Sequence, residues 1–294
     1  MLIQNKKCVI HKQIYQMKQT YHIIWVVFII LLIISSCSSD SAPTPVDPPS
    51  PHISREDSLA LVAIYKEGNG ENWDNKWDLN DISTWTGVGG YLSDSATNEY
   101  RVEKLHLVCN TSYPKGVLSD EIGKLTGLRV LQIDGEGFEG GLPASISNLK
   151  SLEEISIVGT SIMGQIPEGI LSLPKLWRVI ISQCELSGEL PKDITETAPS
   201  LTIVDLSRNH LRGELPNNIK SIRLDLDYND YTKFPFEYII KREELGFKGN
   251  IYMKHNKIAG IIPDSILNNP KWIGDLNLYT NPQKKGYGYT NAPW

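Results

Sequence analysis

The chain has little cysteine, no long apolar run and no excess of basic charge. Its four cysteines are spread over 294 residues, so a framework of disulfides is not expected. No apolar stretch reaches the roughly 20 residues that a helix needs to cross a bilayer. The formal net charge is −5. Because an acidic surface repels phosphate backbones, nucleic acid is not expected as a partner. With 40% hydrophobic and 21% charged residues, the chain suits one large globular domain or two small ones.

The longest apolar run is the stretch from Ile23 to Ile34, near the N-terminus. Its length suits the hydrophobic region of a secretory signal peptide. Ser35, Ser36 and Cys37 follow, and the stretch Ile34–Cys37 resembles a bacterial lipobox. The resemblance implies that Cys37 is acylated on sulfur, with palmitate as a typical chain, and that cleavage before it makes it the new N-terminus. The alternative is an uncleaved anchor that happens to be followed by a cysteine.

These features divide the N-terminal part into a signal peptide, residues 1–36, and a lipidated tether, residues 37–52. Either Met1 or Met17 is the start, and Met17 begins a signal of ordinary proportions. The tether is rich in serine and proline and is expected to be extended. Lys6, Lys7, Lys12 and Lys18 would be removed with the signal, which leaves 25 basic against 34 acidic residues. More than one acyl chain on Cys37 gives stable anchoring, so we expect a protein of the bacterial cell envelope, in the outer membrane and exposed at the surface.

Internal repetition is the strongest signal in the chain. Residues 201–219 match the pattern L-x-x-L-x-L-x-x-N-x-L-x-G-x-[IL]-P-x-x-I. Related stretches lie 20 to 27 residues apart along residues 102–281. The eight stretches begin at Val102, Leu128, Leu152, Leu176, Leu201, Ser221, Lys248 and Ile273. This repetition is similar to that of leucine-rich repeat proteins, and the G-x-[IL]-P element resembles the subtype known from plant receptors.

The resemblance implies an α/β repeat solenoid, a leucine-rich-repeat horseshoe with a parallel β-sheet on its concave face. One repeat cannot bury its own aliphatic side chains, so neighbouring repeats stack and share a core. Each L-x-L segment directs two side chains inward, because alternate strand residues point to opposite faces. An asparagine then ends the strand and satisfies backbone groups along a ladder. Asn110, Asn209, Asn229, Asn256 and Asn281 are expected in this position, with Cys184 there as a buried structural thiol.

Caps are expected at both ends of the repeats, residues 53–101 before them and residues 282–294 after them. Ser54 to Asp57 form a capping box that predicts a helix, which the glycines at 68 and 70 end. One face of this helix is expected to carry Leu59, Val62, Ala63 and Lys66. The N-terminal cap of plant relatives usually contains a cysteine pair. This chain has none there, so its cap is expected to depend on the packing of Trp73, Trp77 and Trp85.

Two other cysteines remain in the mature chain, Cys109 and Cys184, in the first and fourth repeats. Three strand spacings of about 4.8 Å separate them by about 14 Å. A disulfide tolerates about 7 Å between Cα atoms at most. We therefore expect no bridge between them.

The repeat register predicts which side chains line the concave face, the usual recognition surface of the family. The middle exposed strand positions are His106, Gln132, Ser156, Ile180, Asp205, Asp225, Tyr252 and Asn277. The later repeats are the richer in acids, tyrosines and hydrogen-bonding groups. The candidate ligand-binding residues are Asp205, Arg208, Asp225, Asp227, Tyr228, Tyr252, Lys254, His255 and Tyr279. The alternative is a solvated sheet face that only needs to be polar.

Metal binding and catalysis find little support. The segment from Asp225 begins like an EF-hand loop, but Asp230 stands where glycine is needed and Phe236 where an acid is needed. His106, His210 and His255 lie in different repeats with no catalytic motif beside them. Asp205 and Asp225 lie on neighbouring strands, but a glycosidase pair needs a deep cleft. No cofactor, no metal and no enzymatic activity are expected.

The sequence therefore predicts a membrane-anchored binding protein that recognises a protein or peptide partner through its concave face. A second hypothesis is a carbohydrate-binding accessory lipoprotein, in which aromatic side chains stack on sugar rings. Trp177, Tyr228, Tyr252 and Tyr279 are the aromatic residues in question. A third is a passive envelope or adhesion component. Fold alone does not decide among them.

Overall fold

A computed structural model describes residues 53–94, 99–110, 114–191, 201–215, 223–233 and 250–259. The predicted signal peptide, Cys37, the tether, the repeat that begins at Ile273 and the C-terminal cap lie outside the described residues. In the described ranges, no helix is both long and apolar enough to span a membrane.

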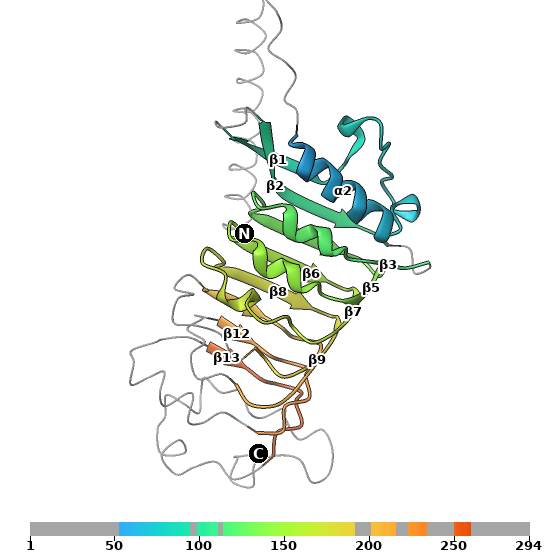
Figure 1. Ribbon diagram of the computed structural model, residues 1–294. Coiled ribbons are helices and arrows are strands. Elements are labelled where there is room, and N and C mark those ends of the chain that lie inside the picture. The colour runs from blue at the N-terminus through green and yellow to red at the C-terminus, as the bar shows by residue number, and fades with distance from the viewer. Residues whose placement is uncertain are drawn as a thin grey trace, which may run out of the picture. The chain divides into compact units, whose positions relative to one another are not determined.

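One long sheet runs through the repeats, with its strands stacked from the N-terminal to the C-terminal end (Figure 1). The strand order is β1-β2-β4-β6-β8-β10-β12-β13. β1 is antiparallel to β2, and each later neighbouring pair is parallel. The bounds are Val88–Asp94 (β1), Glu99–Val108 (β2), Val130–Asp134 (β4), Glu154–Val158 (β6), Arg178–Ser182 (β8), Ile203–Asp205 (β10), Arg223–Asp225 (β12) and Asn250–Tyr252 (β13). The strands from β2 onward lie in the first seven predicted repeat registers.

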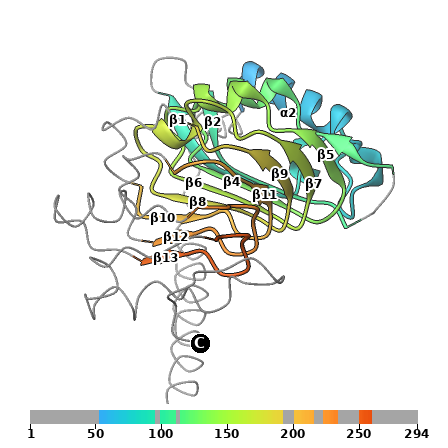
Figure 2. The ribbon, with the colours of Figure 1, turned by 90° about the horizontal axis from the view of Figure 1, so that it is seen from below.

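A second sheet, which the sequence did not predict, lies across the solenoid from the first (Figure 2). Its order is β11-β9-β7-β5-β3. The bounds are Gly116–Val117 (β3), Phe138–Gly141 (β5), Ser161–Gly164 (β7), Glu185–Gly188 (β9) and His210–Leu211 (β11). The glycines of two G-x-[IL]-P elements end β7 and β9: Gly164 has φ 85° and Gly188 has φ 86°, a left-handed conformation that side chains disfavour.

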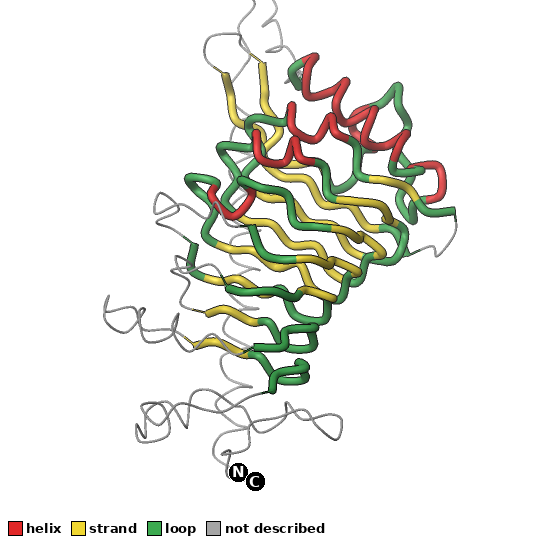
Figure 3. The backbone as a smooth tube through the Cα atoms, turned by 60° about the horizontal axis from the view of Figure 1, so that its bottom comes forward, coloured by secondary structure: helices red, strands yellow, loops and turns green. Residues whose placement is uncertain are grey.

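The core lies between the two sheets, where aliphatic side chains of successive repeats stack. Strands β4 and β6 alternate buried and partly exposed residues, as the L-x-L pattern predicts. Leu131, Ile133, Ile155 and Ile157 are fully buried. Short 3-10 helices precede the strands and lie nearer the N-terminal end (Figure 3). They are Asp120–Lys124 (η3), Ala144–Asn148 (η4) and Ile170–Ser172 (η5).

The predicted cap helix is α2, Arg55–Glu67, which covers the N-terminal end of the sheet. The Ser54 side chain accepts a hydrogen bond from the Asp57 amide, as the capping box predicts. The face that carries Leu59 is not the buried one, because Leu59 is 60% exposed. The buried residues are Asp57, Ala60, Leu61, Ile64 and Tyr65. The buried face includes Asp57, whose carboxylate accepts a hydrogen bond from the Val102 amide of the first repeat at 2.7 Å.

Aromatic packing builds the rest of the cap, around two 3-10 turns, Gly70–Asn72 (η1) and Ile82–Thr84 (η2). Tyr65, Trp77 and Trp85 stack with ring centroids 5.4 and 5.3 Å apart. Trp73 contacts Tyr65 and Trp77 edge-on. Each tryptophan indole also donates to a backbone carbonyl, so the rings are buried without unpaired N–H groups. This confirms the role expected for the tryptophans.

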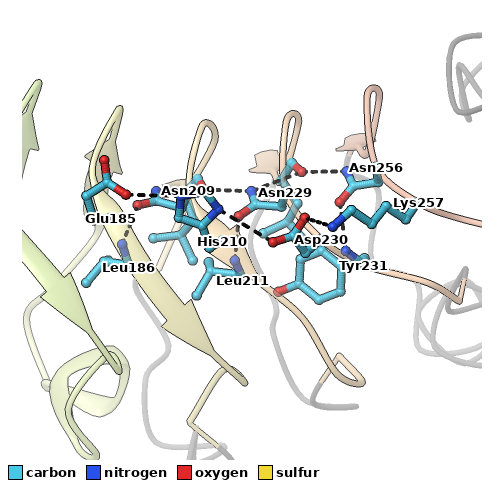
Figure 4. A network of polar contacts seen from close by, with 12 residues as sticks. Glu185, Leu186, Asn209, His210, Leu211, Asn229, Asp230, Tyr231, Asn256 and Lys257 are labelled. Atoms are coloured by element: carbon cyan, nitrogen blue, oxygen red, sulfur yellow. Dashed lines mark hydrogen bonds and ion pairs between the residues drawn. The ribbon is translucent and has the colours of Figure 1, made fainter. Parts of the chain in front are cut away.

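A ladder of buried asparagines links the later repeats (Figure 4). Asn229 shows the pattern. Its amide nitrogen donates to the carbonyls of Leu206 and Leu226, and its amide oxygen accepts from the Leu211 amide at 2.9 Å. Asn209 and Asn256 make the equivalent bonds one repeat earlier and one repeat later. Each asparagine therefore bonds backbone groups of its own repeat and of the preceding one, which confirms the predicted role of these three residues.

Cys184 takes the ladder position in the fourth repeat and is a buried thiol, as expected. Its sulfur donates to the Ser182 carbonyl and, more distantly, to the Ile157 carbonyl. A thiol is a weak acceptor, and the Thr160 hydroxyl instead accepts from the Ile162 amide. Thr160 and Cys184 are themselves 3.2 Å apart. Together the two side chains replace one asparagine.

Asn110 was wrongly placed in the ladder. It is exposed, and its side chain and backbone amide both bond the Asp74 carboxylate of the cap. Cys109 is buried in its place, and its amide donates to the Asp134 carbonyl. The chain therefore continues extended past β2, because no left-handed residue precedes Asn110 as one precedes each later ladder position.

Candidate binding face of the late repeats

Eight of the nine predicted ligand-binding residues lie on one surface, which we term the late concave face. Tyr279 lies outside the described residues. The members of the late concave face are Asp205, Arg208, Asp225, Asp227, Tyr228, Tyr252, Lys254 and His255. Strands β10, β12 and β13 bring them together, since Asp205, Asp225 and Tyr252 are paired in register. Their neighbours in sequence point into the core: Val204, Leu224 and Ile251 are buried.

The three aspartates of this face are held by local hydrogen bonds. Asp205 accepts from the Ser207 amide and hydroxyl at 3.0 and 2.7 Å. Asp225 accepts from the Arg223 guanidinium at 3.0 Å and from the Asp227 amide. Asp227 accepts from the Lys254 backbone amide at 2.6 Å. The carboxylates are therefore fixed to the strands before any ligand binds.

Asp225 was expected to be exposed on the concave face, and this expectation was wrong. It is only 8% exposed, and Arg223 of the same strand forms an ion pair with it. A ligand would thus meet the guanidinium of Arg223, which the sequence prediction did not include. Asp225 holds this arginine in place and offers little exposed surface of its own to a ligand.

The electrostatics of the face follow from this pairing. The hydrogen bond that Arg223 donates to Asp225 raises the pKa of its guanidinium, and the charge of Asp205 adds to the shift. Burial raises the pKa of the Asp227 carboxyl, and the neighbouring Asp225 adds to the shift. Asp205 and Asp225 therefore lie beside a shared cation, unlike two carboxyl groups that divide acid and base roles across a substrate.

Arg208, Tyr228 and His255 form a stack along one side of the late concave face. The Arg208 guanidinium lies 4.4 Å from the centroid of the Tyr228 ring. The rings of Tyr228 and His255 are stacked with centroids 4.1 Å apart. Arg208 belongs to the preceding repeat and His255 to the following one, so the Tyr228 ring lies between them. A second cation–π contact joins Arg223 to Tyr252 at 5.3 Å.

This stack weakens the carbohydrate hypothesis. Sugar binding by an aromatic residue uses the face of the ring, and Arg208 and His255 already lie against the ring of Tyr228. Arg223 lies over one face of Tyr252. Trp177 is half-buried rather than exposed. Within the described ranges, no group of three or more His, Cys, Asp and Glu side chains could hold a metal ion.

Comparisons with known proteins agree on the architecture. The family model described as Leucine Rich Repeat matches residues 200–222. The Arabidopsis receptor kinase HAESA ectodomain, solved with a peptide hormone ligand, is 28% identical with a TM-score of 0.50 over 60% of this chain and 29% of its own. The structure titled PEPR1-AtPEP1 is 23% identical with a TM-score of 0.54 over 72% of this chain and 30% of its own. The fold is a leucine-rich-repeat solenoid.

A third similar structure is the leucine-rich-repeat ectodomain of the receptor kinase SOBIR1 from Arabidopsis thaliana. It is 22% identical with a TM-score of 0.48, and the match covers 73% of this chain and 100% of that ectodomain. The match spans less than a third of the HAESA and PEPR1 chains. A search of curated proteins found no match.

Proposed function

We propose that this chain is a lipid-anchored, cell-surface binding protein that recognises a protein or peptide partner through its late concave face. The leucine-rich-repeat fold is a common scaffold for such binding, and the HAESA ectodomain was solved with a peptide hormone bound. The observation that carries the proposal is the organised, exposed stack of Arg208, Tyr228 and His255. Arginine and tyrosine are enriched among the residues that dominate the energy of protein interfaces. An enzymatic role is not part of this proposal.

The concave face can be tested by site-specific photo-crosslinking in the cells that produce the protein. A benzoyl-phenylalanine at Tyr252, on the late concave face, is expected to yield protein adducts, because a bound partner would lie within reach of its ring. The same residue at Glu139, exposed on β5 of the second sheet, is the matched control and is expected to yield none. Equal adducts from both positions, or none from Tyr252, would contradict the proposed face. Binding to a glycan array without protein adducts would favour the carbohydrate hypothesis instead.

The lipid anchor is tested separately by Cys37→Ser in cells fed an alkyne-tagged fatty acid. The natural chain is expected to carry the tag and to sediment with membranes, because the Cys37 thiol accepts the lipid. The variant is expected to lose the tag completely. Cys8→Ser is the control and should retain it. A variant that remains tagged would refute lipidation at Cys37, and an untagged natural chain in the membrane fraction would support an uncleaved anchor.

A further inference from the structure

Four side chains occupy the same backbone position in four successive repeats, directly before the ladder residue. They are Gln183, Arg208, Tyr228 and His255, and we term them the left-handed column. Their φ values lie between 56° and 57°. The backbone amides of Gln183, Arg208 and Tyr228 each donate to a carbonyl of the next repeat, so the four residues lie in line.

The left-handed conformation is unfavourable for these residue types. Residues with a side chain seldom adopt a positive φ, and a bulky one such as tyrosine is a clear outlier. The two preceding repeats have glycine at the same position, Gly135 and Gly159, also with positive φ. Glycine would therefore fit the column without strain. Retained strain of this kind is a feature of functional sites.

Stacking determines what the column presents to a partner. The Tyr228 ring is stacked on the His255 ring, and the Arg208 guanidinium lies over the Tyr228 ring. The Arg208 guanidinium supplies N–H donors, and the exposed Tyr228 adds its hydroxyl. Gln183 is exposed at the end of the row and adds a side-chain amide. The result is a row of donors along the solenoid axis.

Among the described residues, Arg208 lacks the carboxylate partner that three other arginines of the repeats have. Arg129, Arg178 and Arg223 each form an ion pair with a glutamate or an aspartate. Within the part of the chain that the structure describes, no carboxylate pairs with Arg208, although the whole chain carries a net charge of −5. An oriented guanidinium without a carboxylate is suited to bind one from a partner, often through two parallel hydrogen bonds.

We propose, resting on the proposed function, that the left-handed column is the docking site for an extended acidic segment of the partner protein. Aspartate or glutamate side chains of that segment bind the Arg208 guanidinium and the Tyr228 hydroxyl. The stack holds both groups in place before binding, which lowers the entropy lost when the complex forms. Because the contacts are charge-assisted and exposed, the affinity falls as ionic strength rises.

The test uses the full chain in detergent and three fluorescent octapeptide probes that alternate serine with glutamate, glutamine or lysine. The glutamate probe is expected to bind at least tenfold more tightly than the other two. Arg208→Gly and Tyr228→Gly are expected to weaken it about tenfold or more, the loss of one charge-assisted contact. Both variants should keep their thermal stability, because glycine occupies this position in two repeats. Arg178→Gly removes a paired arginine of the concave face and is the control, with binding unchanged.

Equal binding of the glutamate and glutamine probes, or full binding by Arg208→Gly, would overturn the inference. Tighter binding of the lysine probe would overturn it too, and would point to the aspartates of the late concave face. The crosslinking result at Tyr252 distinguishes a failure of the acidic-segment inference from a failure of the proposed function. Adducts that persist in Arg208→Gly would leave the concave face as the binding surface while removing the acidic segment from the column.

Discussion

Asn229→Leu is expected to lower the free energy of unfolding by about 1–3 kcal/mol, the cost of leaving a buried polar group without its partner. Leucine is similar in size and fits the apolar surroundings, so the loss would come from hydrogen bonding. The Leu211 amide loses its acceptor, which lies at 2.9 Å. The carbonyls of Leu206 and Leu226 are affected less, because Asn209 and Asn256 also donate to them.

Urea denaturation of the Asn229→Leu protein would measure this loss. Asn110→Leu makes the same substitution outside the ladder, where the asparagine is exposed, and should change stability by no more than about 1 kcal/mol. Asn229→Cys is informative as well, since Cys184 shows that a thiol can donate to ladder carbonyls. It should remain destabilising, because no hydroxyl equivalent to that of Thr160 accepts the orphaned amide. Equal losses for Asn229→Leu and Asn110→Leu would contradict the ladder's role.

The contrast between Asn110 and Asn229 also explains how far the sequence could predict the fold. Both asparagines lie three residues after a buried leucine, so their local patterns are identical. What differs is the backbone before them: Tyr228 is left-handed, whereas the chain before Asn110 stays extended and Asp74 of the cap binds the side chain. The repeat pattern specifies strands and inward positions, because each depends on alternation within one repeat. It does not specify contacts with a cap some 35 residues away in sequence.

For the candidate site too, the sequence predicted the inward strand positions but not the contacts between side chains. Alternation along β10, β12 and β13 correctly predicted that Val204, Leu224 and Ile251 enter the core, because one face of each strand is buried. It could not predict that Arg223 would cover Asp225, since that depends on the rotamer of a long flexible side chain. The left-handed column was only partly foreseen. Its stacking depends on the left-handed backbone at these positions. Arginine and tyrosine seldom adopt a positive φ, so the sequence does not indicate one at Arg208 or Tyr228.

The junction between cap and repeats is where a single side chain should matter most. Arg101→Ala is expected to cost about 3–5 kcal/mol at neutral pH, the usual result of leaving a buried carboxylate without its cation. The Asp57 carboxylate is fully buried, and the Arg101 guanidinium lies 2.7 Å from it. The same guanidinium donates to the Lys124 carbonyl and the Thr126 hydroxyl, so its removal also loosens the end of the 3-10 helix η3.

The dependence of this loss on pH distinguishes an unpaired charge from lost packing. Burial raises the pKa of Asp57 above its ordinary 3.8, while Val102 and Arg101 partly oppose the shift. A raised pKa means that the folded state favours the protonated carboxyl. The stability that protonated Asp57 contributes is complete below the pKa that this carboxyl has in the unfolded chain. It is lost as the pH rises through the pKa of Asp57 in the folded protein. Without Arg101 the folded pKa rises further, so the loss in Arg101→Ala should be small in acid and should grow toward neutral pH.

Urea denaturation of the natural protein and of the Arg101→Ala variant between pH 4 and 7.5 would measure this trend. Arg129→Ala is the matched control, because Arg129 is half-exposed and pairs with Glu103 and Glu153 at the surface. It should lose far less, since solvent screens exposed ion pairs. The double variant Arg101→Ala with Asp57→Asn removes the buried charge as well, and it should recover part of the loss at neutral pH. A loss in Arg101→Ala that stays constant with pH, and that Asp57→Asn does not relieve, would mean that Arg101 acts through packing and its backbone contacts alone.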